Sequence, residues 1–572
     1  MNNQTARLLE QHFDTAFAAP DGIAKLRELI LTLAMQGKLV KQVPNDPPAS
    51  ELLKEIEAEK QRLLAASSPR RRGPSPTLPP IKPEEVPYAL PQGWVWVRLG
   101  EVMQFINGDR GKNYPSKDKL SSEGIPFISA VNLSNGTVSQ ENLLCVSEAQ
   151  YQKLGSGKLE KNDLVFCIRG SLGKKAIYPF DIGAIASSLV ILRRYLKEET
   201  FLYFVDIYMS SPFLFEEIRK YDNGTAQPNL SANNFMCFRI PLPPLPEQHR
   251  IVARIDQLMA RCDALEKLRT AREEKRLAVH AAAIKQLLNA PDGSAWDFIQ
   301  KHFAELYTVK ENVAELRKAI LQLAVMGRLV KKDPNDPPAG ELLKEIDAEK
   351  QRLLSSSSPR RRGSSLTLPP IRPEEVPYEL PQGWEWVRFG NVASTRLGKM
   401  LDKAKNRGHL KPYLRNTNVQ WHQFILDDVK QMKFEDGELD EFLILPGDLL
   451  ICEGGEPGRC AIWKDAEIEI YFQKAIHRAR MFPGVTSEYL QVCLTNDAGN
   501  GQLSKYFTGA TIKHFPGDKL NGYIIPLPPL PEQHRIVARI DQLMALCDTL
   551  DQQIDAAAGK QTELLNAVTA QV

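Results

Sequence analysis

The chain has 572 residues, of which 43% are hydrophobic and 25% charged, with a formal net charge of +3 at pH 7. This length predicts two or more domains of ordinary globular composition, and so small a net charge neither identifies nor excludes a nucleic-acid partner. The amino terminus, MNNQTARLLEQHF, lacks the apolar core of a signal peptide, and no stretch approaches the roughly 18 apolar residues of a membrane span, so we expect a cytoplasmic protein.

Residues 1–42 are predicted to be a helical region, and residues 43–90 a Pro- and Arg-rich linker with a short helix. The segment AASSPRRRGPSPTLPPIKPEEVP is typical of a flexible or polyproline tether. Its three arginines, Arg70 to Arg72, are interpreted as solvated, with phosphate contact as the alternative. NDPPA, from Asn45 to Ala49, is interpreted as a helix stop.

Residues 91–245 are predicted to form a mixed α and β domain. IPFISAVNL, from Ile125, and NDLVFCIRGSLGKKAIY, from Asn162, are typical of short strands broken by turn residues. PLPPLPEQ, from Pro241, ends the domain and begins a helix, because proline is tolerated in a first helical turn and the following glutamate suits the helix dipole.

The helix predicted over residues 246–290 has an apolar stripe in steps of four and three, formed by Ile251, Ile255, Leu258, Cys262 and Leu265. About 40 residues at about 1.5 Å each would make a rod of about 60 Å. A rod cannot bury its own stripe, so it must pack against the other copy, against the helices near Leu26 and Leu316, or against a partner. A helix of an ordinary bundle is the alternative.

The second half of the chain repeats the flanking motifs of the first half, but the sequence enclosed between these motifs differs. The sequence from Leu26 returns from Leu316, and PLPPLPEQHRIVARIDQLMA occurs identically from Pro241 and from Pro526. The repeat predicts a helical region over 291–332, a linker over 333–380, a domain over 381–530 and a helix over 531–572, with the stripe Ile536, Ile540, Leu543, Cys547, Leu550 and Ile554.

Between the repeated frames the two inserts differ in sequence but keep weak structural similarities. KPYLRNTNV aligns with IPFISAVNL, GDLLICEGGEPGRCAIW with NDLVFCIRGSLGKKAIY, and NGTAQPNLS and TGATIKHFP precede PLPPLP at equal distance. The predicted fold class is therefore α+β, with two mixed domains of shared topology in a pseudo-two-fold tandem repeat, separated by long coiled-coil-like helices.

No catalytic site, metal site or resident cofactor is predicted. NDPPA is similar to the D/N/S-P-P-aromatic motif of DNA amino-methyltransferases, but Ala49 and Ala339 replace the aromatic residue and no glycine-rich turn precedes it. GSLGKK lacks the spacing of a phosphate-binding loop, the nine histidines and eight cysteines show no metal-ligand spacing, and Asp163 and Asp448 are interpreted as turn formers. The sequence therefore indicates a binding protein.

Two variable domains, each closed by PLPPLPEQxRIVxxIDxLM and each preceded by GKLV or GRLV, NDPPA and LPxGWxWVRxG, resemble the specificity subunit of type I restriction-modification systems. The resemblance covers nearly the whole chain. It implies two target recognition domains that each read half of a split, asymmetric target in double-stranded DNA, held apart by paired antiparallel helices. It also implies partners: two adenine-N6 methyltransferase subunits and the restriction and translocase subunits.

In that family this subunit does no chemistry, so S-adenosylmethionine, ATP and Mg are expected on the partner subunits. Two alternatives stay open at this point. One is a methyltransferase fused to its own recognition domain, and the other is a structural scaffold whose inserts bind proteins.

The candidate DNA-binding residues are loop positions that match between the inserts but differ in chemistry, with phosphate contacts or turn roles as alternatives. In the first domain they are Arg110, Lys112, Ser129, Asn132, Arg169, Lys174, Thr225, Gln227 and Asn229, and in the second Lys399, Arg415, Asn416, Asn418, Arg459, Thr511, Lys513 and His514. Tyr114, Phe127 and Tyr413 are candidate base wedges, with strand packing preferred for Phe127 and Tyr413. The predicted partner-binding residues are Ile251, Ile255, Leu258, Ile536, Ile540 and Leu543.

Overall fold

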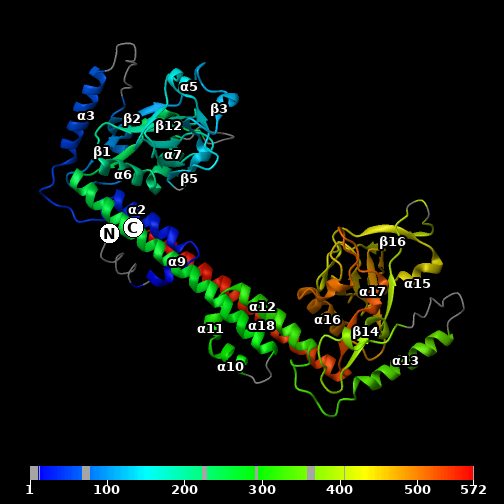
Figure 1. Cartoon of the computed structure of the whole chain (residues 1–572). Helices are drawn as coiled ribbons and strands as arrows, with labels where there is room; N and C mark the ends of the chain where they lie inside the picture. Colours follow the sequence, from blue (N-terminus) through cyan, green and yellow to red (C-terminus); the bar gives the residue numbers. More distant parts are fainter. Residues whose placement is uncertain are drawn as a thin grey trace. The chain divides into compact units, whose positions relative to one another are not determined.

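The computed structural model describes residues 11, 13–66, 78–134, 136–221, 229–289, 294–356, 368–402, 404 and 406–570. The chain divides into two compact units (Figure 1). Unit 1 comprises Met1–Ala271 and Ala557–Val572, and unit 2 comprises Arg272–Ala556. The arginine runs 70–72 and 360–362, and the candidates Thr225 and Gln227, lie outside the described residues.

Unit 1 contains the first variable domain, called domain 1 here, built on two sheets. The central sheet has the order β10-β9-β12-β2 and is antiparallel throughout. A second sheet has the order β3-β7-β4-β11-β8, in which only the β4–β11 pair is parallel. The strands are β2 (Met103–Asn107), β3 (Leu120–Ser121), β4 (Ile125–Ile128), β7 (Cys145–Val146), β8 (Lys158–Glu160), β9 (Leu164–Cys167), β10 (Lys175–Ile177), β11 (Ile182–Ile185) and β12 (Leu189–Arg194).

Short strands and helices complete domain 1. Its two ends pair antiparallel through β1 (Val95–Arg98) and β13 (Arg239–Leu242), so the insert leaves the frame where it entered. β5 (Leu133–Ser134) pairs antiparallel with β6 (Thr137–Val138). The helices are α4 (Leu99–Val102), α5 (Glu148–Lys153), α6 (Glu199–Tyr208), α7 (Pro212–Tyr221) and α8 (Ala232–Met236).

Unit 2 contains domain 2, which repeats the four-stranded central sheet and has a second sheet with the order β19-β16-β22. Its central sheet has the order β15-β23-β20-β21, a parallel pair joins β16 to β22, and β14–β24 closes the domain. The elements are β14 (Glu385–Arg388), α14 (Phe389–Val392), β15 (Ala393–Leu397), β16 (His409–Leu414), β17 (Val419–Gln420), β18 (Gln423–Phe424), β19 (Lys430–Phe434), α15 (Leu439–Phe442), β20 (Leu449–Cys452), β21 (Cys460–Ile462), β22 (Tyr471–Phe472), β23 (Ile476–Met481), α16 (Ser487–Gly499), η7 (Gln502–Tyr506), α17 (Gly517–Gly522) and β24 (Ile524–Leu527). The prediction of two mixed domains with a shared topology is confirmed.

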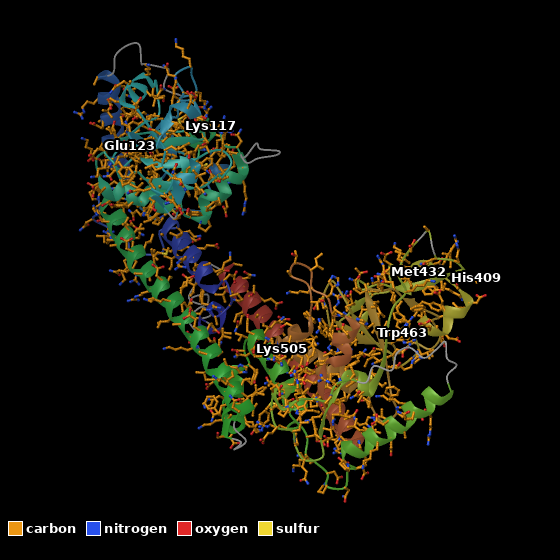
Figure 2. All side chains as sticks on the ribbon, turned by 45° about the vertical axis from the view of Figure 1, so that its right-hand side comes forward. Lys117, Glu123, His409, Met432, Trp463 and Lys505 are labelled. Carbon is orange, nitrogen blue, oxygen red and sulfur yellow. The ribbon has the colours of Figure 1, made fainter. Side chains whose placement is uncertain are left out.

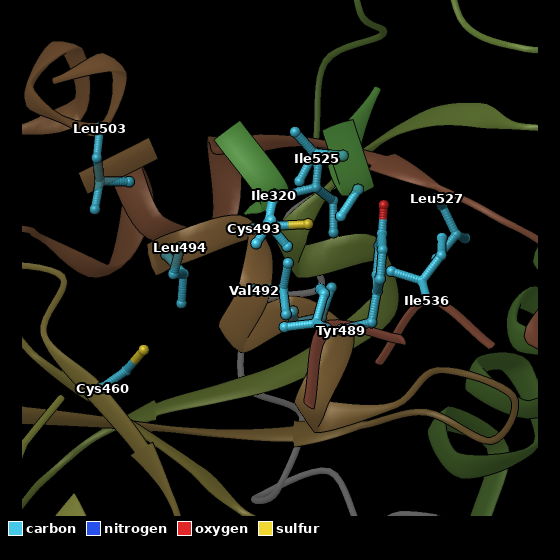
Figure 3. Close-up of a cluster of buried hydrophobic side chains, with 14 of the residues drawn as sticks. Ile320, Cys460, Tyr489, Val492, Cys493, Leu494, Leu503, Ile525, Leu527 and Ile536 are labelled. Atoms are coloured by element: carbon cyan, nitrogen blue, oxygen red, sulfur yellow. The ribbon is translucent and has the colours of Figure 1, made fainter. Parts of the chain in front are cut away.

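Domain 2 has two hydrophobic cores, one on each side of its central sheet. Because side chains alternate along a strand, Leu449 and Ile451 of β20 enter one core while Leu450 and Cys452 enter the other. The first core gathers side chains from α12, α16, β24 and α18 (Figure 3). The second includes Met432 and Trp463, whose positions are labelled in Figure 2.

The frame consists of helices, including two that each contribute to both units. α9 (Leu245–Asn289) and α18 (Leu530–Thr569) begin within the two PLPPLPEQ phrases. The other frame helices are α2 (Gly22–Met35), α3 (Ala49–Ala66), α10 (Ser294–Lys301), α11 (Phe303–Leu306), α12 (Lys310–Val325) and α13 (Ala339–Ser356). Among the described residues no helix has the length and apolar character needed to cross a membrane.

NDPPA is not a helix stop. α2 ends at Met35, and the two prolines of NDPPA lie directly before α3, which begins at Ala49. The backbone N–H of Ala49 donates to the Gly93 carbonyl at 2.8 Å, and Ala339 repeats this contact with Gly383 at 2.9 Å. The prolines therefore end an extended approach to a helix, and the alanine that replaces the aromatic residue is a buried anchor.

Each apolar stripe packs within its own unit, and partner binding by the six predicted residues stays a prediction. Ile251 and Ile536 are 0% exposed, and Leu258 and Leu543 pack against the same cores. The stripe packs with the helices near Leu26 and Leu316, one of the three packings considered, and Leu258 and Leu543 remain partly exposed. Leu265 departs from the predicted stripe because it is 45% exposed.

Candidate nucleic-acid interface

The two domains present the same loop at one end of the central sheet. It joins β9 to β10 in domain 1 and β20 to β21 in domain 2, 285 positions later. Gly170 and Gly173 have φ of +78° and +93°, and their counterparts Gly455 and Gly458 have +84° and +90°. These left-handed conformations favour glycine and fix the same turn twice, so corresponding side chains leave the backbone at corresponding places.

A second segment lies beside this loop in both domains. An isolated antiparallel bridge joins Arg169 to Asn229, and the equivalent bridge joins Gly454 to His514. In domain 1 the Arg169 Nε donates to the Asn229 Oδ1 at 3.2 Å. In domain 2 the His514 Nδ1 lies 3.1 Å from a Glu453 carboxylate oxygen. The backbone is shared, while the chemistry at these matched positions differs.

A third loop, after β4 and after β16, is fixed by a buried asparagine. The Asn132 Oδ1 accepts from the Ser129 N–H at 3.0 Å, and the Asn418 Oδ1 accepts from the Arg415 N–H at 2.9 Å. Asn132 is 3% exposed and Asn418 is 2% exposed. Both side chains hold the loop in place, and their contact with DNA stays a prediction.

The remaining candidates of domain 1 lie on exposed loop positions. Arg110, Lys112, Arg169 and Lys174 are exposed, and Ser129 is half-buried with its hydroxyl bonded to Asn132 at 3.0 Å. The Arg110 guanidinium donates to the Ser187 carbonyl at 3.4 Å. Arg169 and Asn229 are in contact, whereas a DNA role for any of these residues stays a prediction.

In domain 2 several predicted cations are neutralised within the domain. Lys399 is 9% exposed and paired with Glu438, and its contact with DNA stays a prediction. Arg415 is paired with Asp428 at 2.7 Å, and Arg459 with Glu456 at 2.9 Å. Thr511 and Lys513 are exposed on the segment before His514.

The structure brings Asn416, Arg459 and His514 together around Gly454. The Asn416 Nδ2 donates to the Gly454 carbonyl at 3.2 Å, and Arg459 donates to the Asn416 carbonyl at 2.8 Å. Burial raises the pKa of the neighbouring Cys452 thiol to about 11, so this thiol is not a reactive thiolate. The surface therefore offers hydrogen-bonding groups rather than a nucleophile.

Sequence reasoning missed the residues that complete this network, Trp421 and Glu456. The Trp421 indole N–H donates to Glu456 at 2.7 Å, and the same carboxylate accepts from Arg459. Glu456 could have been found, because it follows the GG pair of the aligned loop at the position of Ser171. Trp421 could not, because its partner lies 35 positions away.

Two of the three candidate base wedges are buried in the strand packing that the sequence favours for them. Phe127 and Tyr413 are each 4% exposed and belong to hydrophobic cores, which confirms strand packing. Tyr114 is 36% exposed and packs edge-on against Phe127, with ring centroids 5.9 Å apart.

Asp163 and Asp448 serve as buried turn anchors, as predicted. Asp163 accepts from the Glu160 N–H at 2.8 Å and Asp448 from the Leu445 N–H at 2.7 Å, and each also binds an arginine of the next strand in the sheet. Burial raises the pKa of Asp163 despite its contact with Arg193. Within the described ranges no group of three or more His, Cys, Asp or Glu could hold a metal ion.

Comparison with known proteins places this geometry in a family. A family model described as the type I restriction modification DNA specificity domain matches residues 91–273 and again 381–558. The chain is 30% identical to the EcoEI specificity subunit of Escherichia coli, over 96% of this chain and 93% of that one. It is 31% identical to the EcoAI specificity subunit of the same species, with the same coverage.

A solved structure, the HsdS subunit from Thermoanaerobacter tengcongensis, aligns at 20% identity over 85% of this chain and 98% of that chain, with a TM-score of 0.42. The sequence matches alone establish membership. The chain belongs to the family of type I restriction-modification DNA specificity subunits, which recognise DNA and are not themselves catalytic.

Proposed function

We propose that this chain reads a bipartite, asymmetric target in double-stranded DNA, one half with each domain, on behalf of two adenine-N6 methyltransferase subunits and the restriction and translocase subunits. The observation that carries the proposal is the matched loop pair. Arg169, Lys174 and Asn229 stand where Gly454, Arg459 and His514 stand, on one backbone. A fold kept constant while its exposed chemistry changes is what two different half-sites require.

Docking of the partner subunits is proposed on the exposed side of the long helices. The stripe packs into the chain's own core, but Leu265, Leu268 and Leu546 are 45%, 68% and 60% exposed. Exposed leucines on otherwise polar helices suit contact with another protein. S-adenosylmethionine, ATP and Mg would then act on the partner subunits, and the assembly would work in the cytoplasm, where its DNA substrate lies.

Mapping of methylated adenines tests this function. Cells that express the chain with its methyltransferase should carry N6-methyladenine in one split motif, and cells with the methyltransferase alone should not. Replacing residues 95–240 by the insert of another family member should change one half of the motif and leave the other half and the assembly intact. A swap that alters both halves would contradict the assignment of one half-site to each domain.

Two measurements address the alternatives. Incubation of the isolated chain with labelled S-adenosylmethionine and duplex DNA should give no transfer, whereas robust transfer would favour a fused methyltransferase. Duplex binding by the assembled complex should weaken steeply with salt, because phosphate contacts release counterions. A flat salt response would favour the protein-binding scaffold instead.

A further inference from the structure

The matched loop of domain 2 carries an exposed negative charge where domain 1 has a neutral residue. Ser171 of domain 1 and Glu456 of domain 2 lie 285 positions apart in the same turn, one residue after the glycines with left-handed φ. The Glu456 side chain is 54% exposed. Phosphates repel a carboxylate, so such a group on a DNA-facing loop suits the base edges better than the sugar-phosphate backbone. In the major groove the base edges supply hydrogen-bond donors as the amino groups of cytosine and adenine.

The Glu456 carboxylate is held in place rather than free to turn away. Its two oxygens accept from the Trp421 indole at 2.7 Å and from the Arg459 guanidinium at 2.9 Å. Arg459 is only 15% exposed and is itself fixed by the Asn416 carbonyl. Each carboxylate oxygen has a second lone pair, so the group can still accept from a base.

The hairpin that supplies Trp421 carries backbone strain. His422 has a φ of +63° at the tip between β17 and β18, where the equivalent residue of domain 1 is Gly136 with a φ of +76°. A non-glycine residue in this region costs about 1 kcal/mol or more, and such strain clusters at functional sites. Domain 2 thus places Trp421 and His422 beside the loop of Glu456. The left-handed backbone of His422 costs conformational free energy there, whereas domain 1 has a glycine at the same position.

The neighbouring carboxylate, Glu453, does not play the same role. It is 21% exposed and lies 3.1 Å from the His514 Nδ1, whereas Glu456 is 54% exposed. Glu456 is therefore the carboxylate of this loop that a ligand can reach.

We propose that Glu456 is a specificity-determining residue of domain 2 and accepts a hydrogen bond from the exocyclic amine of a base, N4 of cytosine or N6 of adenine. This inference rests on the proposed function. Trp421 and Arg459 are positioning residues that orient the carboxylate and offset its charge. Domain 1, with Ser171 at this position, reads its half-site without such a contact.

The test uses the full chain assembled with its methyltransferase subunits. Glu456→Gln keeps the size of the side chain and removes its charge, and it should lower discrimination at one base pair of one half-site by about tenfold or more. The readouts are the methylation motif in cells and competition binding of duplexes that differ at single base pairs. Duplexes that carry N4-methylcytosine or N6-methyladenine at single positions then identify the amine, because the methyl group should weaken wild-type binding at that base alone.

Matched variants separate base reading from folding and from charge. Trp421→Phe keeps the ring and removes the donor, so it should weaken discrimination at the same base pair to a smaller extent. Glu488→Gln removes an exposed charge from the first turn of α16 and should leave the motif unchanged. Ser171→Ala makes the equivalent change in domain 1 and should leave the half-site of domain 2 unchanged.

Some outcomes contradict the proposal. If Glu456→Gln binds all duplexes more tightly to the same degree and keeps the wild-type motif, the carboxylate only repels phosphate. If Glu456→Gln fails to assemble while Trp421→Phe assembles with full discrimination, Glu456 is structural. If the wild-type assembly shows no sequence preference at all, the proposed function itself fails, which is a different result from either of these.

Discussion

Individual residues explain why the phrase PLPPLPEQ is copied without change. The Glu247 carboxylate accepts from the Trp94 indole at 2.9 Å, and Glu532 repeats the contact with Trp384 at 2.9 Å. The following arginines, at positions 250 and 535, each pair with the aspartate of NDPPA. Three motifs that are far apart in the sequence therefore meet at one joint in each unit, and a change in any of them would break it.

The buried glutamates of these joints make stability depend on pH. Burial raises the pKa of Glu247 and of Glu532, so the folded state holds these protons more tightly than the unfolded chain does. The contribution of each group is then full below its ordinary pKa of 4.5 and is lost as pH rises through the raised value.

The variants Glu247→Gln and Glu532→Gln lack this titration. Relative to wild type, each should gain in free energy of unfolding as pH increases from below 4.5 toward neutrality. Urea denaturation of the wild type and both variants over this range measures the difference. Glu532→Gln should gain more, because Gln42 donates to Glu247 whereas the Oε1 atom of Glu532 is buried without a hydrogen bond in the described structure. A difference that is flat with pH would contradict the assignment.

At the scale of elements, the long helices are stabilised by the stripe that each of them buries. Ile255 is 4% exposed and Ile540 is 5% exposed, at the same position of the two copies. Ile255→Ala and Ile540→Ala should each lower the free energy of unfolding of its own unit by about 3 kcal/mol, since a buried side chain is lost and a cavity remains. Leu265→Ala removes an exposed leucine of α9 and should change the free energy of unfolding by less than about 0.5 kcal/mol.

Hydrogen exchange assigns each effect to a unit. Ile255→Ala should lower protection of the β1–β13 pair and Ile540→Ala that of β14–β24, because each stripe packs into the core that contains its pair. If Leu265→Ala lowered the protection of the β1–β13 pair as much as Ile255→Ala does, the buried stripe would lie on another face of α9.

The elements also show what the sequence could and could not predict. The repeat and the steps of four and three located α9 and α18, because a helix of this length needs a continuous stripe. The sequence predicts only a short helix within the linker of residues 43–90, and the structure places the 18 residues of α3 there, with Lys54, Lys60 and Arg62 each paired with a glutamate three positions earlier. Alignment of the inserts matches Arg169 and Asn229 with Gly454 and His514, which form equivalent bridges, but the burial of Asn132, Lys399 and Asn418 depends on contacts that no local pattern encodes.

At the scale of the whole molecule, each unit is completed by the end of a helix that begins beside the other domain. Leu565, near the end of α18, is 0% exposed and packs in unit 1 with Ala16, Phe17 and Leu29. His280, which lies 285 positions earlier in α9, is 1% exposed and bonds in unit 2 to the Tyr307 hydroxyl at 3.0 Å. Equivalent positions of α9 and α18 thus each contribute a buried side chain to the unit in which the helix ends. Neither half of the sequence is a complete unit by itself.

This arrangement predicts that the carboxyl terminus stabilises the amino-terminal half. Removal of residues 557–572 would uncover Ala16 and Leu29, so hydrogen exchange should show loss of protection in α2 while β20 and β23 of unit 2 keep theirs. Leu565→Ala should act in the same direction and cost about 3 kcal/mol, whereas Asn566→Ala, at an exposed position, should cost less than about 0.5 kcal/mol. Loss of protection in unit 2 instead would mean that the last turns of α18 belong to the core of the unit in which the helix begins.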